Sequence, residues 1–304
     1  MAFHLAPNKL TDLGSAARLV PGGGLVALGG SLSARLPMAL VREIIRQKIS
    51  ELHVVGSAHS IDVDMLVAAR AIKVCEQSYV GFEQDHGLAP AFRRAAQNGD
   101  LEVRESCCDT VLTQIRAAEM GLPFLPVRGV KGTGIRDLHP EYGEVTCPFT
   151  GEVLVAVPAL SPDVALVHAP LGDRAGNLHL DQPYVLDERF AAASAAVVAT
   201  VDRIAPTPEV QEAGIVIPAY RVAAVVETPF GAHPASAYPG YAYDRAHLAE
   251  WVKAASTAEG ADDYLDRYVF SADEAGYRDL IGTEQLTRLT RYAESATTWM
   301  SLYS

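Results

Sequence analysis

The chain has 304 residues, of which 49% are hydrophobic and 20% charged, a composition typical of a globular protein with a sizeable buried core. Its 25 Lys and Arg against 37 Asp and Glu give a net charge of −12, which argues against nucleic acid or an anionic membrane as a partner. The longest apolar run, residues 191–201, is about half of a membrane span, and the first residues lack an export pattern, so we expect a cytoplasmic protein without membrane contact.

Short β-branched runs alternate with amphipathic segments along most of the chain, after a first helix whose N-cap is predicted at Thr11 and Asp12. We expect strands at residues 24–30, 51–57, 73–81, 101–106, 152–160, 164–170, 195–204 and 221–228. We expect helices at residues 37–47, 61–72, 90–99 and 110–121. This alternation predicts one α/β domain over residues 1–304, with an open, mainly parallel sheet, helices on both faces and a mostly helical segment from about residue 238.

In such folds, ligands bind beyond the carboxyl ends of the strands, so the residues that follow each strand are candidates for the site. These residues are mostly small or polar, and they are Gly29–Ser31, Gly56–His59, Gly81–Glu83, Glu105–Ser106 and His168–Pro170. We call them the predicted rim.

The glycine clusters around residues 22–30 match neither a dinucleotide fingerprint nor a phosphate-binding P-loop, because their spacing and the required flanking residues differ. The glycine-rich loop at residues 127–137 carries Arg128, Lys131 and Arg136, a local positive charge that an acidic protein needs for an anionic ligand. A plain solvated loop explains the same pattern.

The cysteines Cys75, Cys107, Cys108 and Cys147 have no CxxC spacing, and we expect reduced thiols. No His or Cys cluster accompanies Cys107 and Cys108, so we expect neither a metal site nor a catalytic thiolate there, and core packing explains at least one of the two. Ser106 lacks the GxSxG pattern of a serine hydrolase.

Glu105 ends the predicted strand LEVRES, in which alternation places Leu101, Val103 and Glu105 on one face. A carboxylate at the end of an apolar row is expected to be partly desolvated and can act as a base. A helix-capping or salt-bridged glutamate is the commoner role for this residue type. Both roles stay open at this point.

The segment VTCPFTGEVLVAVPALSPDVALVHAPLGDRAGNLHL at residues 145–180 resembles the α subunits of class I CoA-transferases, in particular the glutaconate CoA-transferase A type. The same order of matches continues over nearly the whole chain, with GLVALGG, RLP, VREIIRQ, GLPFLPVRG and ETPFGAHPASAYPGY. The chain departs from the family pattern at Gly22–Gly24, in place of an Asp-Gly turn, and at Ser31, in place of a Phe. The smaller Ser31 implies a larger pocket and a bulkier acyl group.

The resemblance implies an acyl-CoA substrate, an open α/β fold and a homologous β subunit, usually in an α2β2 heterotetramer. In this family the transferase glutamate belongs to the β subunit, so this chain alone does not decide between transfer and hydrolysis. No metal is expected, and no cofactor beyond the CoA that the substrate carries. The substrate-binding candidates are Ser31, Arg35, Ser57, Arg128 and Lys131.

The combination of RESCCD at residues 104–109 with GGSLSARLP at residues 29–37 is similar to the branch of cholesterol ring-cleaving hydrolases. That similarity implies hydrolytic opening of the last cyclohexenone ring of a steroid-derived acyl-CoA, a C–C cleavage of retro-Claisen type, with Glu105 as the catalytic acid/base. Two alternatives stay open. In one, the chain is the α subunit of a CoA-transferase for a dicarboxylic acid and Glu105 only lines the pocket; in the other, it is a non-catalytic subunit.

Overall fold

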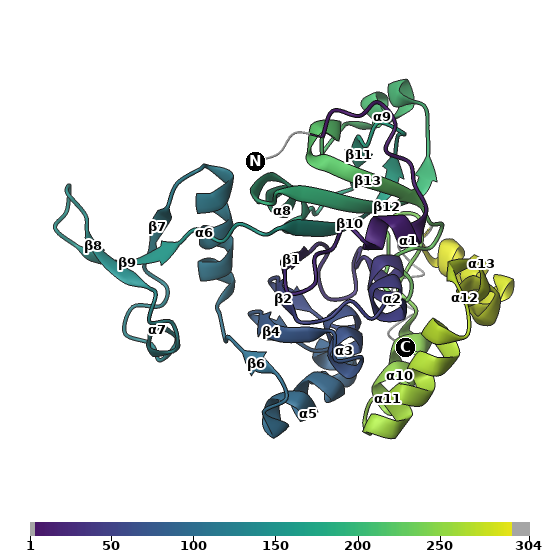
Figure 1. The fold of residues 1–304 in the computed structure, drawn as a ribbon, viewed down its shortest axis with the longest axis horizontal. Coiled ribbons are helices and arrows are strands. Elements are labelled where there is room, and N and C mark those ends of the chain that lie inside the picture. The colour runs from purple at the N-terminus through teal and green to yellow at the C-terminus, as the bar shows by residue number, and fades with distance from the viewer. Residues whose placement is uncertain (1–3, 294–304) are drawn as a thin grey trace.

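A computed structural model describes residues 4–293 of the chain. Among these residues, eight strands form one sheet in the order β13-β12-β10-β1-β2-β4-β6, with β11 paired to β10 (Figure 1). All neighbours along this order are parallel, and β11 alone is antiparallel to its neighbour. The strands are β1 (Leu25–Leu28), β2 (Leu52–Val55), β4 (Ile72–Glu76), β6 (Glu102–Val103), β10 (Val164–Gly172), β11 (Leu178–His179), β12 (Ala196–Ile204) and β13 (Val222–Glu227).

Successive residues of the strands face two different layers of helices, because side chains alternate across a strand. Val26 and Leu28 of β1 pack into a core with α2 (Met38–Arg46) and α3 (Ile61–Ala68). Ala27, between them, packs into a second core with α6 (Cys108–Glu119) and α8 (Asp187–Ala193). The predicted α/β fold, with a mainly parallel sheet and helices on both faces, is therefore confirmed.

The local predictions hold with small shifts in the boundaries. Helix α1 (Leu13–Ala17) follows its N-cap Asp12, whose Oδ1 accepts a hydrogen bond from the Ser15 amide at 2.7 Å. The predicted strand at residues 73–81 holds two strands, β4 and the short β5 (Tyr79–Val80), and β5 pairs with β3 (Ala58–His59) outside the main sheet. The remaining helices of the α/β part are α4 (Glu83–His86), α5 (Pro90–Asn98), α9 (Thr207–Ala213) and the 3-10 turn Ala219–Arg221.

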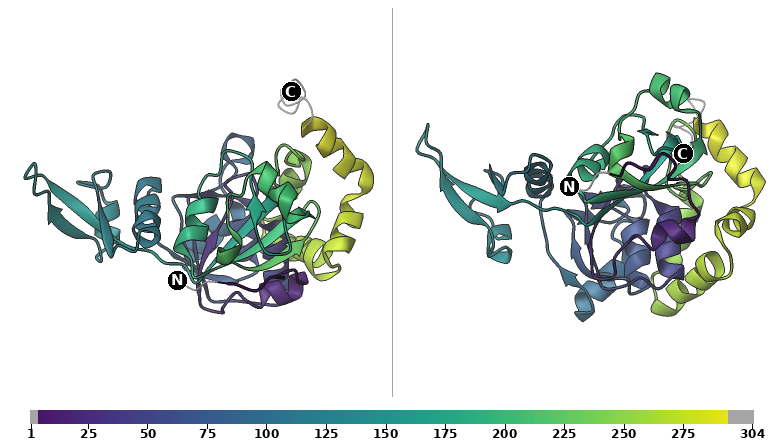
Figure 2. Two further views of the ribbon diagram at one scale, coloured as in Figure 1. Left: turned by 90° about the horizontal axis from the view of Figure 1, so that it is seen from above. Right: turned by 45° about the horizontal axis from the view of Figure 1, so that its top comes forward.

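A small antiparallel sheet projects from the body of the molecule beyond α6 (Figures 1 and 2). It has the order β7-β9-β8, formed by β7 (Phe124–Val127), β8 (Gly143–Thr146) and β9 (Val153–Pro158), and it carries the short helix α7 (Ile135–Leu138). We call residues 122–160 the arm. The strand predicted at residues 152–160 is thus correct as a strand, but it lies in the arm and not in the parallel sheet.

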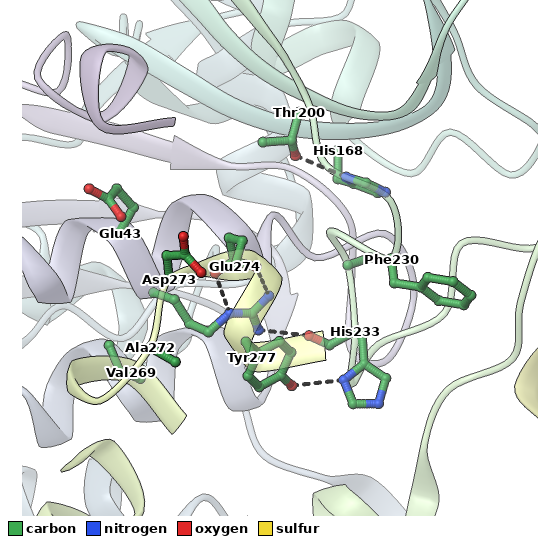
Figure 3. Close-up of polar contacts among 12 residues, drawn as sticks. Glu43, His168, Thr200, Phe230, His233, Val269, Ala272, Asp273, Glu274 and Tyr277 are labelled. Atoms are coloured by element: carbon green, nitrogen blue, oxygen red, sulfur yellow. Dashed lines mark hydrogen bonds and ion pairs between the residues drawn. The ribbon is translucent and has the colours of Figure 1, made fainter. Parts of the chain in front are cut away.

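The C-terminal segment is helical, as predicted, and consists of α10 (Arg245–Ala254), α11 (Ala258–Leu265), a π-helical turn (Asp266–Phe270), α12 (Glu274–Ile281) and α13 (Thr283–Ala293). The last part of the predicted segment, residues 294–304, lies outside the described residues. Arg42 of α2 holds α12 in place, since its Nε and Nη2 donate to the two carboxylate oxygens of Glu274 at 2.8 and 2.7 Å (Figure 3). Its Nη1 also donates to the His233 carbonyl at 2.9 Å.

Helix α3 is buried on all sides between the sheet and the helices around it, and even its acidic residues Asp62 and Asp64 are inaccessible. The carboxylate of Asp64 accepts hydrogen bonds from the Phe92 amide at 2.7 Å and from Trp251 Nε1 at 2.9 Å. Burial raises the pKa of Asp64 to about 7, although these two donors oppose the shift. None of the described helices is long and apolar enough to cross a lipid bilayer.

Candidate active site

Neighbouring parallel strands bring the loops at their carboxyl ends together, as expected for the predicted rim. The Ser78 amide, after β4, donates to the Ser57 carbonyl, after β2, at 3.0 Å. The Ser106 amide, after β6, donates to the Gln77 carbonyl at 3.4 Å. Three loops therefore form one continuous edge that carries Ser57, Ser78 and the segment of Glu105.

The loop after β1 joins the same edge, and the buried side chains of Arg35 and Asp187 hold it from the protein interior. Ser31 Oγ donates to the Ala58 carbonyl at 3.0 Å, which connects this loop to the one after β2. Arg35 is 3% exposed, and its Nη2 lies 3.0 Å from Asp187 Oδ2. The other oxygen of Asp187 accepts the Gly30 amide at 2.8 Å.

Asp187 and Arg35 thus fix the shape of the loop at residues 29–35. A Cβ atom on Gly29 would lie 2.5 Å from Asp187 Oδ1, so only glycine allows this close approach. Burial raises the pKa of Asp187, while the charge and hydrogen bond of Arg35 oppose the shift. Arg35 is engaged inside the protein, and its direct contact with a substrate stays a prediction.

Cys108, the first residue of α6, lies on the same edge. Its Sγ is 3.0 Å from Ser78 Oγ and 3.4 Å from Ser57 Oγ, and the residue is exposed. Cys107, the N-cap, is half-buried and packs against the apolar cluster at the base of the arm. Core packing therefore describes Cys107 only in part, and it is wrong for Cys108, because the N-terminus of α6 opens onto the edge.

Glu105 lies between β6 and α6, and it is exposed. The expectation that it ends an apolar row of a strand is wrong, because β6 contains only Glu102 and Val103, both exposed. β6 is the last strand of the sheet and has β4 as its one neighbour. It ends at Val103, two residues before Glu105. The main-chain carbonyl of Glu105 accepts a hydrogen bond from His139 Nε2 of the arm at 2.8 Å. The catalytic role of Glu105 stays a prediction.

The basic loop of the arm pairs its charges within the arm. Arg128 donates from Nε and Nη2 to the carboxylate of Glu152 at 3.0 and 2.7 Å, and Lys131 Nζ donates to the Val153 carbonyl at 2.8 Å. The Arg128 side chain is nevertheless 74% exposed, so its guanidinium remains accessible to solvent. Anion binding by Arg128 and Lys131 stays a prediction.

Two histidines of the predicted rim are buried in the interior. His168 was expected after a strand, but β10 continues to Gly172, so His168 lies within it and bonds Thr200 Oγ1 through Nδ1 at 2.9 Å (Figure 3). His59 is inaccessible, with its Nδ1 2.6 Å from Asp62 Oδ2. Across residues 4–293, no group of three or more His, Cys, Asp or Glu side chains is placed to hold a metal ion.

The fold and this edge can be compared with known proteins. The family model of the coenzyme A transferases matches residues 11–228, which include the parallel sheet, the arm and the whole candidate site. The chain belongs to the coenzyme A transferase family. An uncharacterised protein of Archaeoglobus fulgidus is 32% identical over 95% of this chain, and the chain spans 65% of the length of that protein.

Two named relatives match this chain over most of its length. The A-type subunit of the glutaconate CoA-transferase from Acidaminococcus fermentans is 30% identical over 90% of this chain and 91% of its own length. The cholesterol ring-cleaving hydrolase IpdA subunit of Mycobacterium tuberculosis is 32% identical over 90% of this chain and 96% of its own length.

Two solved structures agree with the fold. The crystal structure of the Acidaminococcus fermentans glutaconate CoA-transferase matches with a TM-score of 0.88 and 30% identity, over 92% of this chain and 95% of that chain. The structure of a variant of the decarboxylase AibA/AibB matches with a TM-score of 0.79 and 32% identity, over 86% of this chain and 98% of that chain.

Within this CoA-transferase fold, the sequence reasoning missed three residues that shape the edge. Ser78 was placed inside one long strand, although the three polar residues Glu76–Ser78 interrupt the apolar residues there and were a usable signal. Asp187 and His139 had no local signal, because their partners Arg35 and Glu105 lie 152 and 34 residues away in the sequence.

Proposed function

We propose that this chain is the α subunit of a two-subunit enzyme that hydrolytically opens the last cyclohexenone ring of a steroid-derived acyl-CoA, with Glu105 as the acid/base residue. The observation that carries the proposal is the position of Glu105, an accessible carboxylate on the loop after β6, next to the loops that carry Ser57 and Ser78. The similarity to the IpdA subunit, named as part of a cholesterol ring-cleaving hydrolase, supports this substrate class.

The reaction needs one carboxylate and one water molecule. Glu105 takes a proton from water, and the hydroxide adds to the carbon of the ring ketone. The bond between this carbon and the α-carbon of the thioester then breaks, and its electron pair stays on the α-carbon as the thioester enolate. Glu105 returns the proton to that carbon, which leaves a carboxylic acid on an opened acyl-CoA. General acid/base catalysis of this kind contributes roughly 10²- to 10⁴-fold.

A homologous B-type subunit completes the enzyme in this proposal, in an α2β2 heterotetramer located in the cytoplasm. The relatives that are named as subunits support a partner, and so do the apolar side chains around the arm. Seven large apolar residues are exposed between residues 103 and 153: Val103, Met120, Leu122, Phe124, Leu138, Phe149 and Val153. These residues lie on β6, at the C-terminal end of α6 and on the arm, and exposed large apolar side chains are candidates for a protein interface. Alone, the chain is expected to be inactive or poorly soluble, and size-exclusion chromatography of the co-expressed pair is expected to give the heterotetramer.

A CoA-transferase for a dicarboxylic acid is the second candidate. The high structural similarity to glutaconate CoA-transferase, with a TM-score of 0.88, favours it. In that enzyme class CoA moves from the donor acyl-CoA to an acceptor acid, the donor leaves as a free acid, and Glu105 only lines the pocket.

One assay separates the two candidates. The chain and its B-type partner are co-expressed, and the complex is incubated with a cyclic β-keto acyl-CoA, with and without an acceptor acid. Ring-opened product in the absence of an acceptor supports hydrolysis. Consumption of the acyl-CoA only in the presence of an acceptor supports transfer.

The same assay on Glu105→Gln tests the residue. This variant is expected to lose turnover by orders of magnitude while it still assembles and binds, because Gln keeps the shape but cannot take a proton. Cys107→Ser is the matched control from the same loop and is expected to retain most activity. A fully active Glu105→Gln complex contradicts the assignment.

A further inference from the structure

His139 comes from the arm, between α7 and β8, and reaches back to the loop that carries Glu105. Its side chain is 1% exposed. Its Nε2 donates to the Glu105 carbonyl at 2.8 Å, and its Nδ1 lies 2.9 Å from Glu141 Oε1. The ring thus bridges two acceptors.

The bond to the Glu105 carbonyl requires a proton on Nε2, because a carbonyl oxygen can only accept. Nδ1 of the same ring faces the Glu141 carboxyl group. Burial alone would raise the pKa of Glu141, but the His139 hydrogen bond and the charge of Arg104 lower it below the usual value.

The orientation of the His139 ring is fixed from a second side. The ring stacks on Tyr142, with 4.4 Å between the centroids and an angle of 8° between the planes. The Tyr142 hydroxyl donates to Gln114 Oε1 of α6 at 3.3 Å. The arm and α6 together therefore hold the imidazole in one position.

The loop from Arg104 to Cys107 has no regular structure, and its amide groups are tethered to the sheet and to α6. The Arg104 amide donates to the Cys75 carbonyl at 2.9 Å, and the Cys107 amide donates to Thr110 Oγ1 at 3.2 Å. The Glu105 carbonyl and the Ser106 amide share one peptide plane, which is held by the shorter bond from His139 to the carbonyl at 2.8 Å and by the longer bond from the Ser106 amide to the Gln77 carbonyl at 3.4 Å. This plane sets the direction in which the Glu105 side chain leaves the loop.

We propose that His139 is a positioning residue for Glu105: its Nε2–H anchors the Glu105 carbonyl and so aims the carboxylate at the substrate. The inference rests on the proposed function, in which Glu105 is the acid/base group. A shift of a reacting group by about 1 Å can cost on the order of 10²-fold in rate, so one main-chain hydrogen bond is enough to matter. The arm then has a direct effect on chemistry, because it supplies this contact.

The test compares His139→Ala and His139→Gln in the complete two-subunit enzyme. Glutamine places an amide N–H near the former Nε2. We expect kcat of His139→Ala to fall roughly 10- to 100-fold with KM little changed, and His139→Gln to recover most of the loss.

His179→Gln, a histidine on β11 outside the site, is the matched control for the loss of an imidazole. Each complex is also checked for elution volume and melting temperature. A His139→Ala enzyme with wild-type kcat overturns the proposal. Equal loss of kcat in both variants together with loss of assembly also overturns it, because it assigns His139 to the fold alone.

The double variant Glu105→Gln/His139→Ala separates this inference from the proposed function. If His139 acts through Glu105, the double variant is no slower than Glu105→Gln alone. A fully active Glu105→Gln enzyme refutes the proposed function itself. An inactive Glu105→Gln enzyme beside a fully active His139→Ala enzyme refutes only the role of His139.

Discussion

Arg42 and Glu274 are 232 residues apart in the sequence, yet they meet in the interior through two hydrogen bonds of 2.8 and 2.7 Å. Arg42 is 1% exposed and Glu274 is 8% exposed, so both charges lie away from water. Burial alone raises the pKa of Glu274, but the charges of Arg42 and Arg46 reverse this shift and keep its pKa below the usual value. The pair connects α12 of the C-terminal segment to α2, the helix that packs on the sheet.

The two halves of this pair are expected to respond differently to mutation. Glu274→Gln leaves the Arg42 guanidinium buried without a carboxylate, and we expect a loss of about 3–5 kcal/mol in the free energy of unfolding. Arg42→Met is expected to cost less, because Arg46 still bonds Glu274 at 3.0 Å. The double variant Arg42→Met/Glu274→Met is expected to recover stability relative to Glu274→Gln. Urea denaturation of all three variants is the measurement, and a Glu274→Gln protein as stable as the wild type contradicts this prediction.

The histidines under the C-terminal helices predict acid sensitivity. Burial and the nearby His233 lower the pKa of His247 to about 3, and its Nε2 shares a 2.6 Å hydrogen bond with the Tyr264 hydroxyl. The pKa of an unfolded histidine is about 6.5, so between about pH 6.5 and 3 the unfolded state binds more protons. His247 therefore stabilises the fold above this window, and the contribution is lost as the pH falls, by about 1.4 kcal/mol per pH unit.

Denaturation at several pH values checks the acid effect. We expect His247→Gln to flatten the decline of stability below pH 6.5. His4→Gln, near the surface, is the control and is expected to leave the decline unchanged. A His247→Gln protein with the full wild-type slope shows that other groups cause the acid sensitivity.

Arg128 and Lys131 are expected to bind the anionic part of an acyl-CoA. Arg128→Ala or Lys131→Ala should raise KM more than it lowers kcat, since uniform binding is lost. Arg136→Ala is the comparison variant. It removes another arginine of the same loop which, like Arg128, pairs with a glutamate of the arm, here Glu144 at 2.6 Å. Steady-state kinetics of the complex measure the effect. An unchanged KM in Arg128→Ala and Lys131→Ala contradicts this prediction and supports the alternative, a plain solvated loop.

The four thiols are expected to differ in reactivity. Cys108 is exposed on the edge and should react first with iodoacetamide, whereas Cys75 is fully buried, and burial raises the pKa of its thiol well above the usual value. Acyl-CoA is expected to protect Cys108 if the edge is the substrate site. Peptide mass spectrometry gives the labelling rates. Equal labelling of Cys108 with and without acyl-CoA places the substrate elsewhere.

The parallel sheet was predictable because its strands are short apolar runs between amphipathic helices, and each strand carries its own local signal. The sequence did not show that the strands of the arm form a separate sheet. A strand such as β9 has the same residue preferences in either sheet, and its pairing with β7 and β8 is a non-local choice.

For the site, the sequence predicted which loops meet at the edge but not the contacts of the individual side chains there. Strand order alone brings Ser57 and Glu105 to one side of the sheet, so following each strand to its end was enough for these residues. The surroundings of Glu105 depend on where β6 stops and on a histidine of the arm, and periodicity in the sequence reports neither. Arg35 shows the same limit, since its burial depends on Asp187.

The arm also has a consequence for the synthesis of this protein in the cell. In the small sheet, β7 and β8 are both edge strands with unpaired backbone groups, next to exposed side chains such as Phe149, which is 93% accessible. Open edges beside apolar side chains promote strand-to-strand aggregation. Chains made in excess of the partner are therefore expected to aggregate or be degraded, so balanced synthesis of the two subunits becomes a condition for a soluble pool.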